Sequence, residues 1–223
     1  MMKLRRRYPL PDGKKSKLYE AYYSVANKLM LWDKGDQIGR AFLITSAVAG
    51  EGKTYTAINL ACNLALRQKR VLLVDANSWS PMLTSRFNLK EKKGFPDVSE
   101  LLEIKEKRPF PQNFPGLYLM GIGTNSGSDL IQSLSDHLGA WLAEAKKVFD
   151  IILLDSPAIN SYDETRMLAP LADGVLLVVK ALKTPVREIL TARDTIRETE
   201  GNLLGVVLNG YREYIPKAIR SWL

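Results

Sequence analysis

The stretch that decides the fold of this chain is Ser46-Ala47-Val48-Ala49-Gly50-Glu51-Gly52-Lys53-Thr54. A short apolar run precedes it at 41–44, and an apolar pattern with helical spacing follows it at 57–66. The order of strand, glycine-rich turn, Gly-Lys-Thr and helix is typical of a phosphate-binding loop. In such a loop, backbone N–H groups of the turn and of the helix N-terminus point at phosphate oxygens. The stretch therefore predicts a phosphate site between a buried strand and a helix.

The residue types in the loop fit this chemistry. Gly50 and Gly52 let the backbone approach a phosphate closely. Lys53 can reach the β- and γ-phosphates of a nucleotide, and the Thr54 hydroxyl can ligate Mg²⁺. The full pattern starts with a glycine where this chain has Ala47, so an ordinary strand–turn–helix without a ligand is the alternative. The predicted nucleotide contacts in and directly after this stretch are Ala49, Gly50, Glu51, Gly52, Lys53, Thr54 and Tyr55.

Length and composition indicate one domain. The chain has 223 residues, 46% of them hydrophobic, which suffices for a substantial core. Its one cysteine, Cys62, falls in the helix after the loop and is predicted to be a buried thiol. No apolar run is long enough to span a membrane, and the basic N-terminus lacks the apolar stretch of a secretory signal. We expect a cytoplasmic protein.

The net charge of +8 is unevenly distributed. Residues 1–17 carry seven basic side chains and one acidic one, so we interpret 1–16 as a basic arm. This arm is either solvated or attracted to anionic lipid or an acidic partner. Nucleic acid is disfavoured because no aromatic and basic platform accompanies it. At the other end, 211–223 predicts a short basic amphipathic helix that packs on its own domain, on a partner, or on an anionic membrane.

Alternating strand and helix patterns fill the region between these ends, 17–210. The predicted strands are 41–46, 71–75, 117–120, 151–155, 174–179 and 203–208. The predicted helices are 17–32, 57–67, 134–148, 163–171 and 185–201, with Thr184 as the N-cap of the last. Such alternation predicts a doubly wound α/β fold with a mainly parallel sheet, in which ligands sit at the carboxyl ends of the strands.

Two aspartates end strands of this predicted sheet. Asp75 ends the strand after the loop helix, and Asp155 ends a second apolar strand. With Lys53 they should converge on one pocket, although each could also cap the turn that follows it. A Mg²⁺–triphosphate site needs carboxylates for the metal and for the nucleophile. We therefore predict Lys53, Asp75 and Asp155 as catalytic, and Thr54, Asp75 and Asp155 as the residues that hold the metal.

The set resembles the bacterial tyrosine autokinases of capsule and exopolysaccharide synthesis. These belong to the phosphate-loop ATPases of the MinD/ParA type, which also include the division-site-placing and chromosome-partitioning ATPases. The stretches that carry the resemblance are Thr45 to Ala61, Val71 to Pro81, Asp129 to Ser133, Phe149 to Pro157, Gly205 to Asn209, and Glu20-Ala21-Tyr22 in the leading helix 17–32.

The resemblance implies ATP and Mg²⁺ as cofactors, and a cytoplasmic location at the inner face of the membrane. It also implies that Asn209 contacts the adenine edge of ATP, although Asn209 could instead be a turn residue before Gly210. It implies a membrane-embedded polysaccharide co-polymerase as activator, here a separate chain. It also implies autophosphorylation in trans of C-terminal tyrosines, for which Tyr211 and Tyr214 are the candidates, within a homo-oligomer or nucleotide-dependent dimer.

Several positions depart from the family pattern. Asn77 stands where the family has a second aspartate, and Trp79 where it has an arginine. Tyr23 and Ala26 replace two arginines of the leading helix that serve oligomer contacts. The tail holds two tyrosines rather than a cluster. The alternative function is therefore a catalytically weakened, ATP-switched scaffold or positioning ATPase.

Overall fold

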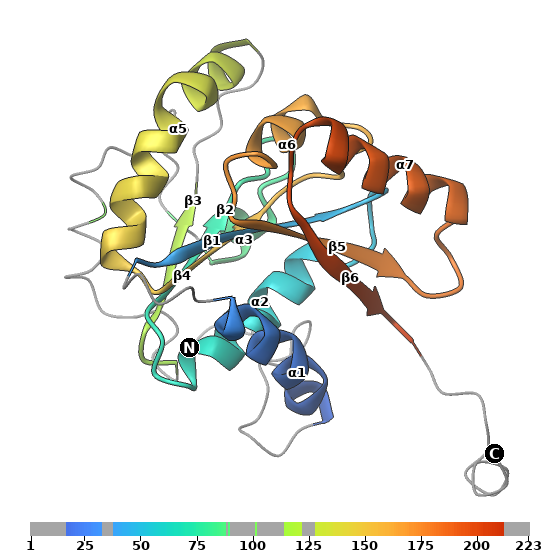
Figure 1. Ribbon diagram of the computed structural model, residues 1–223. Helices are drawn as coiled ribbons and strands as arrows, with labels where there is room; N and C mark the ends of the chain where they lie inside the picture. The colour runs from blue at the N-terminus through green and yellow to red at the C-terminus, as the bar shows by residue number, and fades with distance from the viewer. Residues whose placement is uncertain are drawn as a thin grey trace, which may run out of the picture.

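The computed structural model describes residues 17–32, 38–87, 89, 101, 114–121 and 128–211 (Figure 1). The predicted arm, 1–16, lies outside these residues. So does the predicted tail helix apart from Tyr211, and with it Tyr214. Within the part of the chain that is described, no helix combines the length and the apolar character that crossing a membrane requires.

Six strands form one sheet in the order β3-β2-β4-β1-β5-β6. Every neighbouring pair is parallel. The strands are β1 Arg40–Ser46, β2 Val71–Asp75, β3 Leu117–Gly121, β4 Ile151–Asp155, β5 Gly174–Lys180 and β6 Leu203–Asn209. The predicted doubly wound α/β fold is confirmed, and the sheet is parallel throughout.

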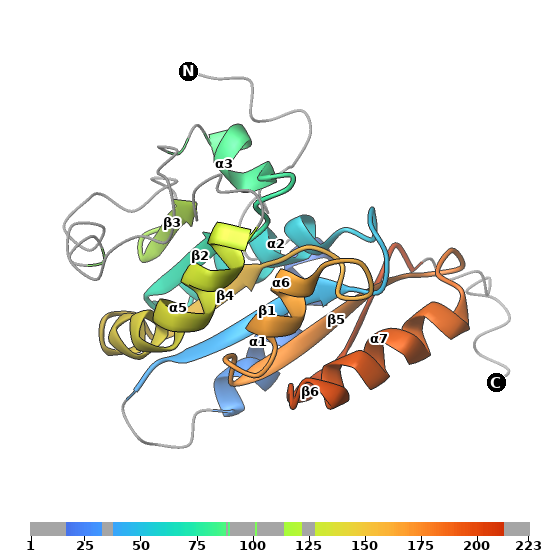
Figure 2. The same ribbon diagram turned by 90° about the horizontal axis from the view of Figure 1, so that it is seen from above.

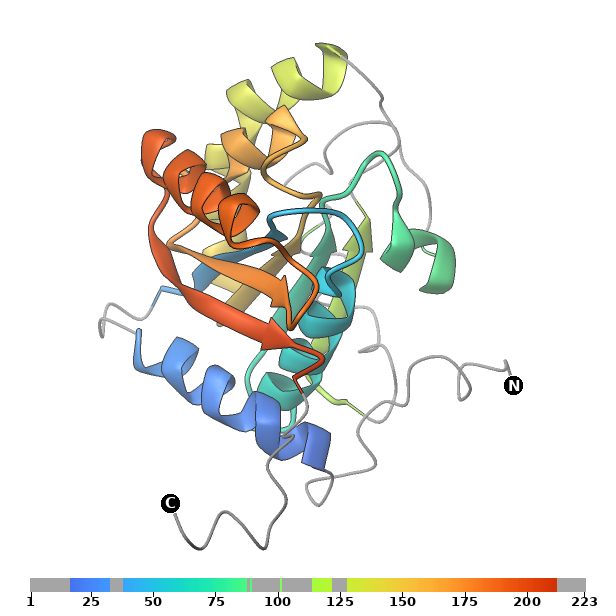
Figure 3. The same ribbon diagram turned by 90° about the vertical axis from the view of Figure 1, so that its right-hand side faces the viewer.

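Helices cover both faces of the sheet. Helix α1, Lys17–Leu31, and helix α2, Lys53–Ala65, lie together on one face (Figure 3). Helices α5, Ser128–Val148, α6, Asp163–Leu168, and α7, Val186–Glu198, cover the other face, as the view onto it shows (Figure 2). The short helix α3, Met82–Phe87, follows β2.

The central strands are apolar on both faces because both faces are covered. In β1, Phe42 and Ile44 pack into the core beneath α1 and α2, while Ala41 and Leu43 pack into the core beneath α5, α6 and α7. This alternation follows from the two-residue period of a strand. It explains why these strands are continuous apolar runs in the sequence.

Several helix boundaries differ from prediction, and the starts of α5 and α7 are the informative ones. Helix α5 begins six residues before 134, and Leu130 and Ile131 continue its apolar spacing toward the N-terminus, a signal that the prediction did not use. Helix α7 has Pro185 as its N-cap and Val186 as its first residue, so the predicted N-cap Thr184 is wrong by one position. The Thr184 side chain is directed toward the loop that follows β1.

Candidate functional site

The predicted phosphate loop connects β1 to α2. Strand β1 ends at Ser46 and α2 begins at Lys53, with Gly52 as its N-cap. Gly50 and Gly52 have φ angles of 80° and 94°, the left-handed region that favours glycine. At Gly52 a side chain is also excluded by space, because a Cβ there would lie 2.0 Å from Asn209 Nδ2. The two glycines are therefore required by the shape of the turn.

Lys53 extends back over the loop. Its ammonium donates a hydrogen bond to Ser46 Oγ at 3.0 Å. Burial lowers the pKa of Lys53, and the nearby carboxylates of Asp155 and Glu51 oppose that effect. A partly desolvated cation at the N-terminus of a helix is a suitable partner for a phosphate.

Asp155 lies at the centre of the site. Asp155 is 1% exposed, and neither of its carboxylate oxygens has a hydrogen-bond partner of normal geometry among the described residues. Burial raises the pKa of its carboxyl to about 7 and the charge of Asp75 adds to this rise, whereas the Thr54 hydroxyl and the Lys53 ammonium oppose it. A buried carboxylate without partners is costly unless a cation neutralises it. Asp155 and the Thr54 hydroxyl together therefore fit the requirements of Mg²⁺.

Asp75 is the Cα partner of Asp155 on the neighbouring strand, so the two predicted aspartates do meet. Oxygen Oδ2 of Asp75 accepts the backbone N–H of Thr84 at 2.7 Å, in the first turn of α3. Oδ1 accepts the N–H of Asn77 at 3.4 Å. Burial raises the pKa of Asp75, and these N–H donors oppose the rise. Asp75 thus holds the segment after β2, and its catalytic role stays a prediction.

Glu51 is placed differently from what we expected. Its side chain is turned inward, and the residue is 2% exposed. Oε2 accepts the N–H of Val48 at 2.9 Å, and Oε1 accepts the N–H of Lys180 at 3.1 Å and the hydroxyl of Thr184. The carboxylate therefore binds the loop to the end of β5, and the predicted contact of Glu51 with ATP stays a prediction.

Asn209 anchors the same loop from β6. Its Nδ2 donates to the carbonyl of Glu51 at 2.8 Å. Strands β5 and β6, which follow β1 by more than 120 residues, thus both form hydrogen bonds with Glu51 of the loop. The predicted contact of Asn209 with ATP stays a prediction, because its amide nitrogen already serves the loop.

A cavity of about 340 Å³ opens above the loop. Its walls come from the loop and the start of α2, from the segment after β2, and from the segment after β4. They are formed by Ala49, Gly50, Gly52, Lys53, Thr54, Tyr55, Asn77, Ser80, Met82, Pro157, Ala158 and Tyr162. Six of the predicted ATP contacts therefore line one cavity, and Asp155 lies at the strand end below it.

Sequence reasoning missed the wall that faces the loop. The segment after β4 is fixed there because Thr45 Oγ1 donates to the carbonyl of Pro157 at 2.7 Å and Ile159 N donates to Ser46 O at 2.9 Å. The Ser-Pro pair after Asp155 is the available sequence signal for this segment. Tyr162 carries no such signal, since its place depends on the fold of the whole segment.

Two more residues that the sequence singled out are Asn77 and Tyr211. Asn77 Oδ1 accepts the N–H of Ser80 at 3.1 Å, which is a turn contact. Tyr211, a predicted phosphoacceptor, is 66% exposed just after β6.

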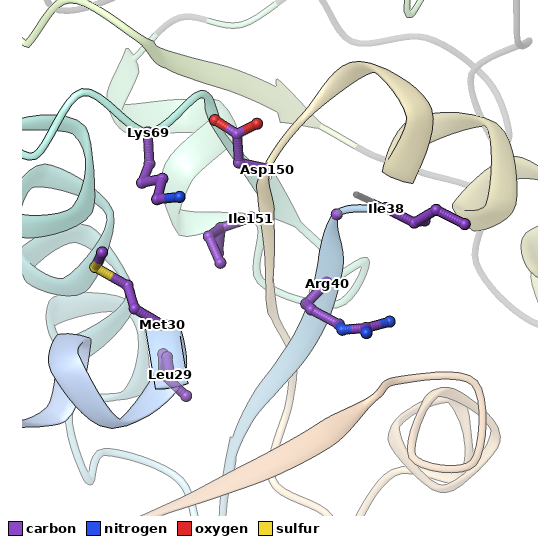
Figure 4. Close-up of a pocket in the computed structure, with 8 residues that line it drawn as sticks. Leu29, Met30, Ile38, Arg40, Lys69, Asp150 and Ile151 are labelled. Atoms are coloured by element: carbon purple, nitrogen blue, oxygen red, sulfur yellow. The ribbon is translucent and has the colours of Figure 1, made fainter. Parts of the chain in front are cut away.

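A second, smaller hollow of about 120 Å³ lies at the opposite end of the sheet, between the end of α1 and the start of β1 (Figure 4). It is separate from the phosphate loop.

The fold and the loop define a nucleotide-binding protein of the phosphate-loop class. The model of the CobQ/CobB/MinD/ParA nucleotide binding domain matches residues 42–220, so the chain belongs to that family.

Within the family, the chain is similar to the bacterial tyrosine kinases, as its sequence predicted. It is 29% identical over 175 residues to tyrosine-protein kinase YwqD of Bacillus subtilis (strain 168), covering 78% of this chain and 74% of that one. It is 31% identical over 179 residues to the succinoglycan biosynthesis transport protein ExoP of Rhizobium meliloti (strain 1021), covering 76% and 22%. The kinase domain of the Escherichia coli tyrosine kinase ETK shares the fold, with a TM-score of 0.74 at 20% identity over 89% and 78% of the chains.

Proposed function

We propose that this chain is an ATP-dependent protein-tyrosine kinase that phosphorylates tyrosines of its own C-terminus and regulates capsular or exopolysaccharide synthesis. The observation that carries the proposal is the cavity in which the loop, Lys53 and Thr54 adjoin Asp155. The similarity to YwqD supports tyrosine as the acceptor, and the similarity to ExoP supports the link to polysaccharide.

In this proposal the loop N–H groups and the Lys53 ammonium bind the β- and γ-phosphates. Thr54 and Asp155 would hold Mg²⁺, which neutralises charge on the phosphates when bound. Preorganised donors of this kind act mainly by positioning and by stabilising charge in the transition state. Asp155 would then gain the cation that its buried oxygens lack.

Phosphoryl transfer requires a tyrosine that accepts the phosphoryl group and a base that accepts the proton of that tyrosine. The phenolic oxygen of tyrosine bonds to the γ-phosphorus as the bond to the β,γ-bridging oxygen breaks, and ADP leaves with that electron pair. The phenolic proton passes to a carboxylate, for which Asp75 is the candidate. Its Oδ1 is the freer oxygen, because its contact with Asn77 N is 3.4 Å long.

A second candidate is an ATP-switched scaffold or positioning ATPase with weakened catalysis. Asn77 favours it, because its side chain closes a local turn where the kinase pattern has a carboxylate. In this alternative the same loop binds ATP and Mg²⁺, and nucleotide state controls assembly rather than phosphorylation.

We further propose a separate membrane-embedded activator, self-association, and a cytoplasmic location at the membrane surface. The basic segment at residues 1–16 and the basic amphipathic tail at 211–223 support attraction to anionic lipid. These partners follow from the resemblance and from charge.

Purified protein incubated with Mg²⁺ and ATP, with and without an activator fragment, tests the two functions together. We expect phosphotyrosine at Tyr211 or Tyr214 by mass spectrometry, and none in Lys53→Met. Lys69→Met, outside the cavity, is the matched control and should be labelled normally. ATP hydrolysis without phosphotyrosine would support the switch, and failure to bind ATP would reject both functions.

A further inference from the structure

An exposed tryptophan stands beside the wall of the cavity that faces the loop. Trp79 is 59% exposed, yet its Nε1 donates to Glu164 Oε1 at 2.7 Å. Glu164 is only 5% exposed, and its carboxylate also accepts the hydroxyl of Ser78 at 3.4 Å. The indole is thus held in place by a buried anion although most of its surface is open to solvent.

The indole is continuous with the cavity through Tyr162. The two ring centroids are 5.8 Å apart, at an interplanar angle of 52°. Tyr162 lines the cavity together with Met82, which is 38% exposed. We call Trp79, Tyr162 and Met82 the aromatic wall. Tilted aromatic pairs and a thioether at ring edges offer a favourable surface to another ring.

We propose that the aromatic wall binds the ring of the acceptor tyrosine. The inference rests on the proposed kinase function. Phosphates bind at the loop, so an acceptor that reaches the γ-phosphate must enter along the facing side, which holds Met82 and Tyr162. The wall is fixed in advance by Glu164, which limits the entropy lost when a peptide binds.

The aromatic wall also lies away from Asn209, the residue predicted to contact the nucleotide. Asn209 and the end of β6 support the loop from the side of Glu51. The wall comes instead from the segments after β2 and β4, whose strands lie on the other side of β1 from β5 and β6. A ring bound on the wall lies on the other side of β1 from Asn209, the predicted nucleotide contact, and we assign that ring to the acceptor.

Two substitutions isolate the ring. Trp79→Ala and Trp79→Phe both remove the indole N–H from Glu164, so any effect through Glu164 is common to them. Only Trp79→Ala removes the aromatic surface. Trp32→Ala is the matched control, because Trp32 is also exposed but follows α1, and lines a groove with β5 and β6 rather than the site.

The probe is a labelled peptide of residues 208–217 with both tyrosines replaced by phenylalanine, which binds without being phosphorylated. In fluorescence anisotropy with a non-hydrolysable ATP analogue, Trp79→Ala should weaken peptide binding by about tenfold and Trp79→Phe by about twofold. Trp32→Ala should leave it unchanged. With the tyrosine peptide, Trp79→Ala should raise KM and leave kcat nearly unchanged.

Equal peptide affinity of wild type and Trp79→Ala would overturn the proposal, as would an absence of peptide binding. So would a tenfold loss of affinity for the ATP analogue, because the ring would then serve the nucleotide. If the phenylalanine peptide binds through Trp79 but the tyrosine peptide is never phosphorylated, the wall binds the peptide but the kinase function fails, and the assignment of the wall as an acceptor site fails with it.

Discussion

The inward-facing carboxylate of Glu51 gives the sharpest prediction about the loop. Glu51→Ala removes the acceptor of the Val48 N–H, which then has no partner inside the turn. A fully buried backbone donor left unpaired costs about 1–3 kcal/mol, and the partly buried N–H of Val48 costs less than that upper value. Lys180 and Thr184 lose less, because Lys180 N still reaches Thr184 Oγ1 at 3.1 Å and Thr184 Oγ1 reaches Lys180 O at 3.2 Å.

We therefore expect Glu51→Ala to lower the free energy of unfolding by about 2 kcal/mol, from the loss of its hydrogen bonds with Val48, Lys180 and Thr184 together. Urea unfolding followed by circular dichroism measures this loss. The freed loop should also bind nucleotide more weakly. If it holds the binding shape one tenth of the time, the Kd for ATP rises about tenfold. Isothermal titration calorimetry measures that change.

Two controls separate geometry from charge. Glu51→Gln can keep its amide oxygen on Val48 N and donate from its amide nitrogen to Thr184, so it should lose less than about 1 kcal/mol. Glu144→Ala removes an exposed carboxylate that pairs with Lys147 on α5, and should change stability by less than about 0.5 kcal/mol. An unchanged Glu51→Ala protein, or a Glu51→Gln protein as damaged as it, would refute the reasoning.

Two further predictions concern the loop glycines and the buried thiol. Gly52→Ala should bind an ATP analogue much more weakly than Gly50→Ala, because a Cβ at position 52 would collide with Asn209. A Cβ at position 50 meets nothing within 4 Å, so Gly50→Ala carries only about 1 kcal/mol of backbone strain. Burial raises the pKa of Cys62 to about 12, above the 9.0 of an exposed thiol. Native protein should therefore resist iodoacetamide at pH 8 and react once unfolded, and rapid labelling of the native protein would contradict this. The free energy of unfolding should fall as pH rises from 9 to 12, because the thiol of the unfolded state loses its proton first.

The sequence was most informative where structure depends on neighbouring residues. The strands at 71–75 and 151–155 were predicted with their observed bounds, because buried parallel strands are continuous apolar runs. The aspartates that end them follow the general rule for ligand sites in such sheets. The turn at Gly50 and Gly52 was likewise predictable, since glycine suits its positive φ angles.

Contacts between distant segments were not predictable. Glu51 meets Thr184 across 133 positions, and no local pattern says which way the Glu51 side chain turns. The same contact explains the error at the start of α7, where Thr184 was expected to cap the helix. The hydrogen bond from Trp79 to Glu164 also joins separate segments. In the sequence, Trp79 is only a departure from the kinase pattern, whereas in the structure it belongs to the aromatic wall.

The departures on α1 have a similar structural account. Ala26 is fully buried, so no cation could stand there without removing that packing. Arg67 of the neighbouring segment lies 3.9 Å from the ring of Tyr23 and donates to Asn27 Oδ1 at 2.6 Å. Where the kinase pattern offers two arginines to another subunit, this chain uses the positions to fasten α1 to the end of α2.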